Sequence, residues 1–135
     1  MSKSPRRSKS PKQNGNAVSQ LISKLFHSRE QAHILHLQTS SYAKHKALNA
    51  YYDAIVGLAD KYAETYQGTV NGVIKGYKSE KFVEGDKAII PYFRKLEKDV
   101  KAMKPRLPKT LDLENAYAEI LDLIHSTLYL LVQLN

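Results

Sequence analysis

The sequence predicts an all-α protein: a bundle of four helices with a long connection between the second and third helices and a disordered basic tail at the N-terminus. Apolar residues recur at helical spacing in four stretches, and glycine, proline, serine or threonine residues separate these stretches. A chain of 135 residues is long enough for a single core of three or four helices. The sequence contains no apolar run of about 18 residues, so we expect no membrane span and no membrane partner. Cysteine is absent, which excludes disulfides, thiolate zinc sites and thiol nucleophiles.

The first 16 residues are basic and almost free of hydrophobic side chains. They hold five of the eight excess positive charges and no acid; the cations are Lys3, Arg6, Arg7, Lys9 and Lys12. Such a segment cannot bury enough surface to fold, so we expect a disordered tail over residues 1–16 and a folded bundle over residues 17–135. Two Ser-Pro-basic units in the tail resemble the Ser-Pro-Lys-Lys repeats of histone tails, which lie along DNA. We therefore expect sequence-independent DNA contact through the tail, with a solubilising or nuclear-targeting tail as the alternative.

The first helix is predicted from Ala17 to Gln38. Its apolar face is formed at helical spacing by Val18, Leu21, Ile22, Leu25, Phe26 and Ala32. His36 falls in the middle of that face, and His33 lies on it too. His27 points to the other side of the helix, and we expect it to be exposed.

The second helix is predicted to start near Ser41, a good N-cap residue, and to run to Tyr66 or Gln67, where Gly68 ends it. One polar stripe of this helix carries imidazole, amide and carboxylate groups, from His45, Asn49, Asp53, Asp60 and Glu64. Asp60 and Glu64 are one turn apart and face the same way. Oxygen and imidazole donors of this kind hold iron, manganese or zinc, whereas in the alternative interpretation these groups are solvated or paired with nearby lysines.

Residues 68–88 hold four of the six glycines of the chain. We predict a long crossover connection with at most a short helix in it. A β-hairpin is the alternative, because Val70-Asn71-Gly72-Val73 has the pattern of a hairpin turn.

The last two helices are predicted from near Ile90 to about Lys104, and from Leu111 or Asp112 to Gln133. Pro91 is tolerated in a first helical turn, and Pro105 and Pro108 end the third helix. The core stripe of the fourth helix consists of Tyr117, Ile120, Leu121, Ile124, Leu128, Leu131 and Val132. Three further residues extend this apolar surface around the helix and suggest a subunit contact: Leu123, Leu130 and Leu134.

The stretches AHILHLQTSSYAKHKAL and LADKYAETYQG resemble the Dps miniferritins, and within them the short Dps-like proteins of phages and large DNA viruses. His36 and His45 match the two histidines of the Dps pattern, and Asp60 and Glu64 follow His45 by fifteen and nineteen residues, in register with that pattern. The chain departs from the pattern at three points. Asn49 replaces an acid. The two histidines are nine residues apart, about three fewer than in Dps, and no tryptophan follows the first. The C-terminal half of the chain shows no motif of the family.

The resemblance implies a ferritin-like bundle with a di-iron site shared across a two-fold dimer interface. It implies that one subunit supplies His36 and His45 and that its mate supplies Asp60 and Glu64, with zinc or manganese able to substitute for iron. His33, which lies twelve residues before His45, Asn49 and Asp53 are the additional candidate ligands.

The function that follows from the resemblance is a DNA-binding miniferritin with ferroxidase activity, assembled as a dimer at least and as a dodecamer by analogy. The tail resembles no secretory signal, so we expect the protein in the cytoplasm or nucleoid of a host, or in a virion. The alternative is a basic helical bundle without metal or catalysis that condenses a nucleoid or builds a virion.

Overall fold

The computed structural model describes residues 11–134, with side chains from Gly15 onward, and is all-helical over this range without any strand. This confirms the predicted all-α bundle of four helices and the long connection between the second and third. The tail cations Lys3, Arg6, Arg7 and Lys9 lie outside the described residues, as does the side chain of Lys12. The elements are α1 (Pro11–Gln38), α2 (Tyr42–Val70), η2 (Asp86–Ala88), α3 (Ile89–Met103), η3 (Lys104–Arg106) and α4 (Leu111–Gln133).

Two predicted helix boundaries were wrong. Helix α1 begins at Pro11 and not at Ala17, so residues 11–16, which we assigned to the tail, are helical. Helix α2 continues through Gly68 to Val70 and ends at Asn71, which adopts a left-handed conformation with φ 54°. Gly68 is tolerated inside the helix because a glycine there costs only about 1 kcal/mol relative to alanine. Asn is among the few residues that accept a left-handed conformation without a large penalty.

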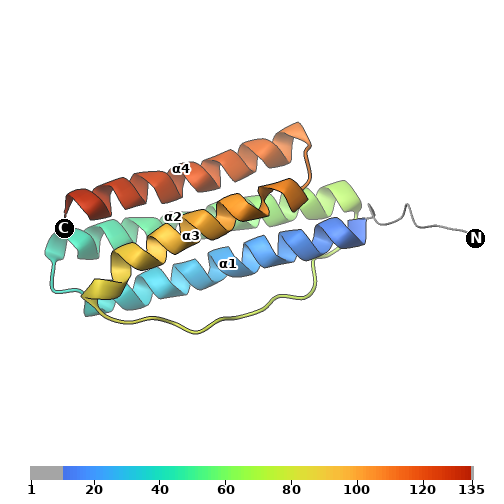
Figure 1. Cartoon of the computed structure of the whole chain (residues 1–135). Helices are drawn as coiled ribbons and strands as arrows, with labels where there is room; N and C mark the ends of the chain where they lie inside the picture. Colours follow the sequence, from blue (N-terminus) through green and yellow to red (C-terminus); the bar gives the residue numbers. More distant parts are fainter. Residues whose placement is uncertain (1–10, 135) are drawn as a thin grey trace, which may run out of the picture.

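The four helices form a bundle with one long crossover (Figure 1). Helices α1 and α2 are antiparallel neighbours, and α3 and α4 form a second antiparallel pair. Contacts between α1 and α3 and between α2 and α4 complete the ring of helices. The connection from α2 to α3 runs back along the length of α1, so that α3 starts at the end of the bundle where α2 starts (Figure 1).

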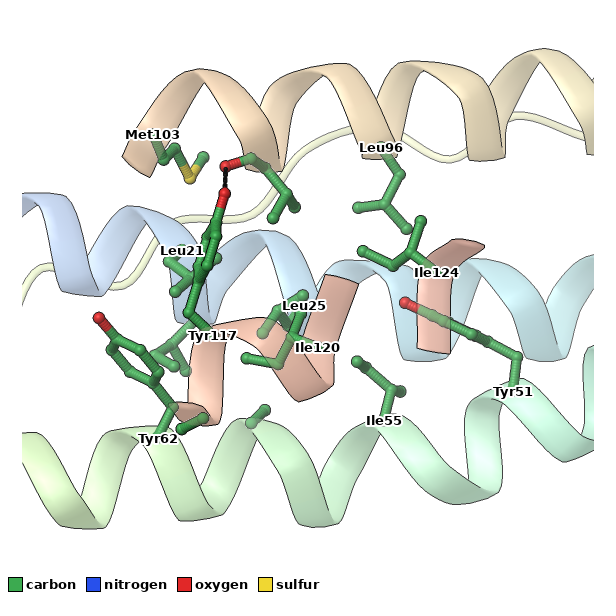
Figure 2. Packing of buried hydrophobic residues seen from close by; sticks show 14 of the residues in the cluster. Leu21, Leu25, Tyr51, Ile55, Tyr62, Leu96, Met103, Tyr117, Ile120 and Ile124 are labelled. Carbon is green, nitrogen blue, oxygen red and sulfur yellow. Dashed lines mark hydrogen bonds between the residues drawn. The ribbon is translucent and has the colours of Figure 1, made fainter. Parts of the chain in front are cut away.

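The interior of the bundle is apolar. Figure 2 shows side chains from all four helices meeting there, among them Leu21 and Leu25 of α1, Ile55 of α2, Leu96 of α3 and Ile120 of α4. No aspartate or glutamate is buried between residues 15 and 134, so the centre of the bundle offers no carboxylate to a metal ion. Phe26 and Val132, which we expected in the core, are 41% and 39% exposed because no helix covers their sides of α1 and α4.

Residues 73–84, which we call the strap, are extended and contain no regular secondary structure, so the hairpin alternative was wrong. Side chains of the helices bind the strap and the residue after it through backbone atoms. Val83 exchanges two hydrogen bonds of 2.8 Å with the amide of Gln31. The other three backbone N–H groups bound in this way are those of Ile74 to Gln67, Lys78 to Ser23 and Gly85 to Gln38. These bonds satisfy backbone groups that in a hairpin would pair with a second strand.

Among the described helices, none combines the length and the apolar character that crossing a membrane requires.

Candidate functional site

His36 and His45 meet at the turn between α1 and α2. Their rings stack with centroids 3.6 Å apart. The Nδ1 atom of His36 bonds to the carbonyl oxygen of His45 at 2.8 Å, and the Nδ1 atom of His45 bonds to the carbonyl oxygen of His36 at 2.9 Å. Because a carbonyl oxygen only accepts, both Nδ1 atoms carry a proton, and in the neutral rings both Nε2 atoms keep a lone pair for a ligand.

Further rings extend this pair into a row along the α1–α2 hairpin. His33 stacks on Tyr52 at 4.3 Å, and the Tyr52 ring meets the His36 ring edge-on at 5.3 Å. At the other end Tyr42 stacks on His45 at 6.2 Å. His33 is therefore next to the pair, as a candidate additional ligand should be.

Two cations border the row of rings. The guanidinium of Arg29 lies 5.6 Å from the Tyr52 ring, and the ammonium of Lys46 lies 5.8 Å from the Tyr42 ring. Such contacts hold the cations near the site through the negative faces of the rings. The positive charge of these two side chains therefore favours the approach of anionic groups from another molecule.

An open pocket of about 320 Å³ lies over the pair and is lined by His36, Tyr42, His45, Lys46 and Asn49. The Asn49 amide is occupied on both sides, since it accepts a hydrogen bond from the Tyr52 hydroxyl at 2.5 Å and donates one to Asp53 at 3.2 Å. Asp53 thereby stands beside the pocket as an exposed carboxylate. Of the predicted ligands, His33, His36, His45, Asn49 and Asp53 are thus gathered at one place.

Asp60 and Glu64 do not reach this place within one chain. They are exposed one turn apart on α2, as predicted. Asp60 follows His45 by fifteen residues of continuous helix, which corresponds to about 22 Å at 1.5 Å per residue. No group of three or more histidine and carboxylate side chains suited to a metal ion occurs within the described part of the chain.

His27 was predicted to be exposed, and this prediction was wrong. It is only 7% exposed, because the strap covers that side of α1. Its Nε2 atom donates to the carbonyl oxygen of Lys81, its Nδ1 atom accepts from the Tyr92 hydroxyl, both at 3.0 Å, and its ring stacks on Phe82. The signal we missed is the run of polar residues Ser23, His27 and Gln31, spaced by four on one face of α1.

A charged cluster beside His27 joins the strap to α1 and α3. Lys24 contacts Glu80 at 2.8 Å and Asp99 at 3.1 Å, and Lys95 contacts Asp99 at 2.6 Å. Partial burial raises the pKa of Asp99, but the hydrogen bonds from Lys95 and Lys24 outweigh burial and hold this pKa below its usual range. Burial lowers the pKa of Lys24, and the bonds to Glu80 and Asp99 outweigh it, so this pKa is raised. Both shifts favour the charged pair.

Comparison with known proteins identifies a family but no described relative. No curated protein and no solved structure matches the chain. Residues 36–131 match the sequence pattern of a family of unknown function (DUF5856). The matched region begins at His36 and includes α2, the strap, α3 and most of α4. The chain therefore belongs to the DUF5856 family.

Proposed function

We propose that this chain is a Dps-like miniferritin that binds and oxidises iron at a site shared by two subunits and that contacts DNA through its N-terminal tail. The observation that carries the proposal is the division of the predicted ligands into two groups, which lie at two separate levels along α2. His45 and its partner His36 stand at one end of α2, and Asp60 and Glu64 stand about 22 Å away. If two copies of α2 packed antiparallel across a two-fold axis, the histidines of each subunit would face the carboxylates of the other, and the dimer would have two sites.

The connectivity supports the proposal. Ferritin-like bundles differ from simple up-and-down bundles by one long crossover connection. This chain has that connection between α2 and α3, and its first and third helices are neighbours, as are its second and fourth.

The geometry of α2 also suits such a pairing. A two-fold axis at the level of residue 54, on the side of α2 that carries Asp53 and Val56, would oppose His45, nine residues before this level, to position 63, between Asp60 and Glu64. Asp53 and Val56 are exposed on this side, and Gly57, which is also exposed, borders it. Because Gly57 has no side chain, a second helix could approach closely there, and the carboxylates of a second copy would meet Lys46 beside the histidine pair.

Ferrous iron would be the substrate, losing an electron to peroxide or dioxygen. The donor set of two imidazoles and two carboxylates suits iron, manganese or zinc. The carbonyl oxygens that accept from both Nδ1 atoms would orient the rings and raise the basicity of Nε2. Asp53 would supply the third carboxylate in place of the acid that Asn49 replaces.

The exposed apolar residues support assembly into an oligomer. Leu37 and Tyr42 at the α1–α2 turn are 72% and 74% exposed, and Tyr129 and Leu130 near the end of α4 are also exposed. Both groups are at the same end of the bundle (Figure 1). A shell of Dps type would cover these exposed apolar side chains. Repeated copies of the basic tail on that shell would hold DNA of any sequence by multivalency, in a host cell or in a virion.

The first experiment measures particle mass by light scattering and the rate of ferrous iron oxidation with peroxide. Asp60→Asn and Glu64→Gln should each slow oxidation at least tenfold, whereas Asp122→Asn, an exposed carboxylate of α4, should leave the rate unchanged. Equal rates in all four proteins would end the ferroxidase proposal.

A mixing experiment tests whether the site is shared. His45→Gln and Glu64→Gln subunits should each be inactive alone. After unfolding and refolding together, about a quarter of the sites should be intact, because half of the dimers are mixed and each mixed dimer has one complete site. If mixing restores no oxidation activity, either one subunit supplies all the ligands or these residues do not form the site.

The alternative function is a basic bundle without metal that condenses DNA or builds a virion. The observation that favours it is the closed hydrogen bonding of the histidine pair, which by itself links α1 to α2. In that case iron would not be oxidised, and the binding of duplex DNA would depend on the tail alone.

A further inference from the structure

The strap presents lysines and aromatic rings in alternation on the surface of the bundle. Lys75, Lys78 and Lys81 are exposed, and the structure pairs none of their ammonium groups with an acid in residues 15–134. Tyr77 and Phe82 lie between or beside these lysines and are 47% and 46% exposed. Exposed rings interleaved with free cations are the features by which proteins hold single-stranded nucleic acids.

The rings are held in place by contacts within the chain. Tyr77 stacks against Phe26 of α1 with centroids 5.9 Å apart, and Phe82 stacks against His27 at 4.7 Å. The strap backbone between them is bound to Ser23 and His27. A base would therefore meet a surface that is already ordered, which lowers the entropy cost of binding.

The acids of the strap do not cancel its charge at the rings. Glu80 is neutralised by Lys24, which it contacts at 2.8 Å. Glu84 accepts a hydrogen bond from Gln38 near the end of α1, after the last lysine of the strap. The part of the strap from Lys75 to Lys81 is therefore a positive surface with rings on it.

Two hollows lie along this surface. One of about 380 Å³ is lined by residues that include Val70, Val73 and Lys75. Another of about 210 Å³ is lined by residues that include Lys78, Ser79 and the Lys24–Glu80 ion pair. Because a strap lysine lines each hollow, the lysine could bind a phosphate while the hollow accommodates the neighbouring base.

We propose that the strap, together with Phe26, binds single-stranded nucleic acid, with the lysines on phosphates and the rings of Tyr77 and Phe82 on unpaired bases. A duplex hides the faces of its bases, so rings of this kind distinguish single strands from double strands. The proposal does not depend on the metal site, and it assigns a contact separate from the duplex DNA contact of the tail.

The test uses the full chain and the fluorescence anisotropy of labelled oligo-dT, oligo-U and a duplex of equal length, over a salt series. The variant Lys75→Gln/Lys78→Gln/Lys81→Gln should reduce the slope of log K against log salt by about 2 for the single strands and weaken binding about 100-fold at 0.1 M salt. The matched control Lys61→Gln/Lys101→Gln/Lys109→Gln removes three exposed lysines from other elements and should have a much smaller effect. The oligo-dT and oligo-U arms decide whether DNA or RNA is preferred.

A second pair of variants tests the rings. Tyr77→Ser should weaken single-strand binding roughly five- to hundredfold, and Tyr77→Phe, which keeps the ring, should restore it. Duplex binding should respond to Lys3→Gln/Arg6→Gln/Arg7→Gln in the tail and not to either strap variant, so that a failure of the tail proposal and a failure of the strap proposal are distinguishable. Equal losses of single-strand affinity in the lysine variant and in its control would overturn the proposal. A changed particle mass in Tyr77→Ser with unchanged affinity would also overturn it, and would indicate that the ring makes a subunit contact.

Discussion

Gln31 provides the most direct test of how the strap is held. Its side chain is fully buried, and it bonds to both the N–H and the C=O group of Val83 at 2.8 Å. The substitution Gln31→Leu keeps a side chain of similar size on α1 but removes both hydrogen bonds. The helix and its apolar contacts should remain, while the C-terminal end of the strap loses this attachment.

The cost follows from the two lost bonds. Each contributes about 0.5–1.5 kcal/mol, so local opening of the strap should become easier by about 1–3 kcal/mol. This corresponds to roughly 5- to 150-fold faster exchange of the Val83 amide hydrogen, if that amide exchanges through local opening. As an internal reference, the exchange rates of amides in the middle of α1 and of α4 should keep the same ratio to one another as in the unmodified protein.

The assay is hydrogen exchange followed by NMR, supported by limited digestion with trypsin at Lys78 and Lys81, which should become faster. Gln20→Ala is the matched control, because Gln20 is on the same helix but is exposed and bonds only to Arg106 in the described part of the chain. Unchanged exchange at Val83 in a folded Gln31→Leu protein would refute the view that side chains of α1 hold the strap.

Three further predictions concern the stability of the bundle. Tyr117→Phe should lower the free energy of unfolding by denaturant by about 1 kcal/mol, because the Tyr117 hydroxyl donates to a backbone carbonyl of α3 (Figure 2). Tyr62→Phe should leave this free energy unchanged or raise it, because the buried Tyr62 hydroxyl has no partner among the described residues. Because the pKa of Asp99 is lowered in the folded protein, its ion pairs stabilise the fold at pH values above the pKa of unfolded aspartate, about 3.9. This contribution is lost as the pH falls through the pKa of the folded protein. Asp99→Asn should therefore make the free energy of unfolding, measured by urea titration, fall less steeply with decreasing pH. His36→Ala should destabilise by about 2 kcal/mol in thermal melts, since it removes a buried ring and the hydrogen bond from this ring to the His45 carbonyl. The exposed His125→Ala, which loses only a surface contact with Glu97, should change little, and equal effects of the two variants would contradict the role of the histidine pair.

The sequence was a good guide to the third and fourth helices. Pro105 and Pro108 end a helix on steric grounds that no tertiary contact can relax, and α3 ends at Met103 as a result. Ser41 likewise acts as the N-cap of α2 and accepts from the backbone of Lys44. Gly68 was a weaker signal, because a glycine can end a helix but does not require it to end.

The candidate site was predictable in part. That His36 and His45 would be neighbours follows from a short turn between two helices, since residues on either side of such a turn must be close. The reciprocal hydrogen bonds to their carbonyl oxygens and the row of rings around them depend on how the two helices are rotated against each other. That rotation is set by packing in the core, which a helical wheel of one segment does not contain.

The sequence by itself determined that the chain is all-α, where its third and fourth helices lie, and which residues offer nitrogen and oxygen donors, because these properties are local or periodic. Only the tertiary structure decided that residues 73–84 lie extended along α1 and that His27 is buried beneath them. The physical reason is that side chains up to 55 positions away in the chain hold the strap through one or two hydrogen bonds each to its backbone atoms. Such bonds leave no repeating pattern in the sequence, whereas the burial of a helical face does.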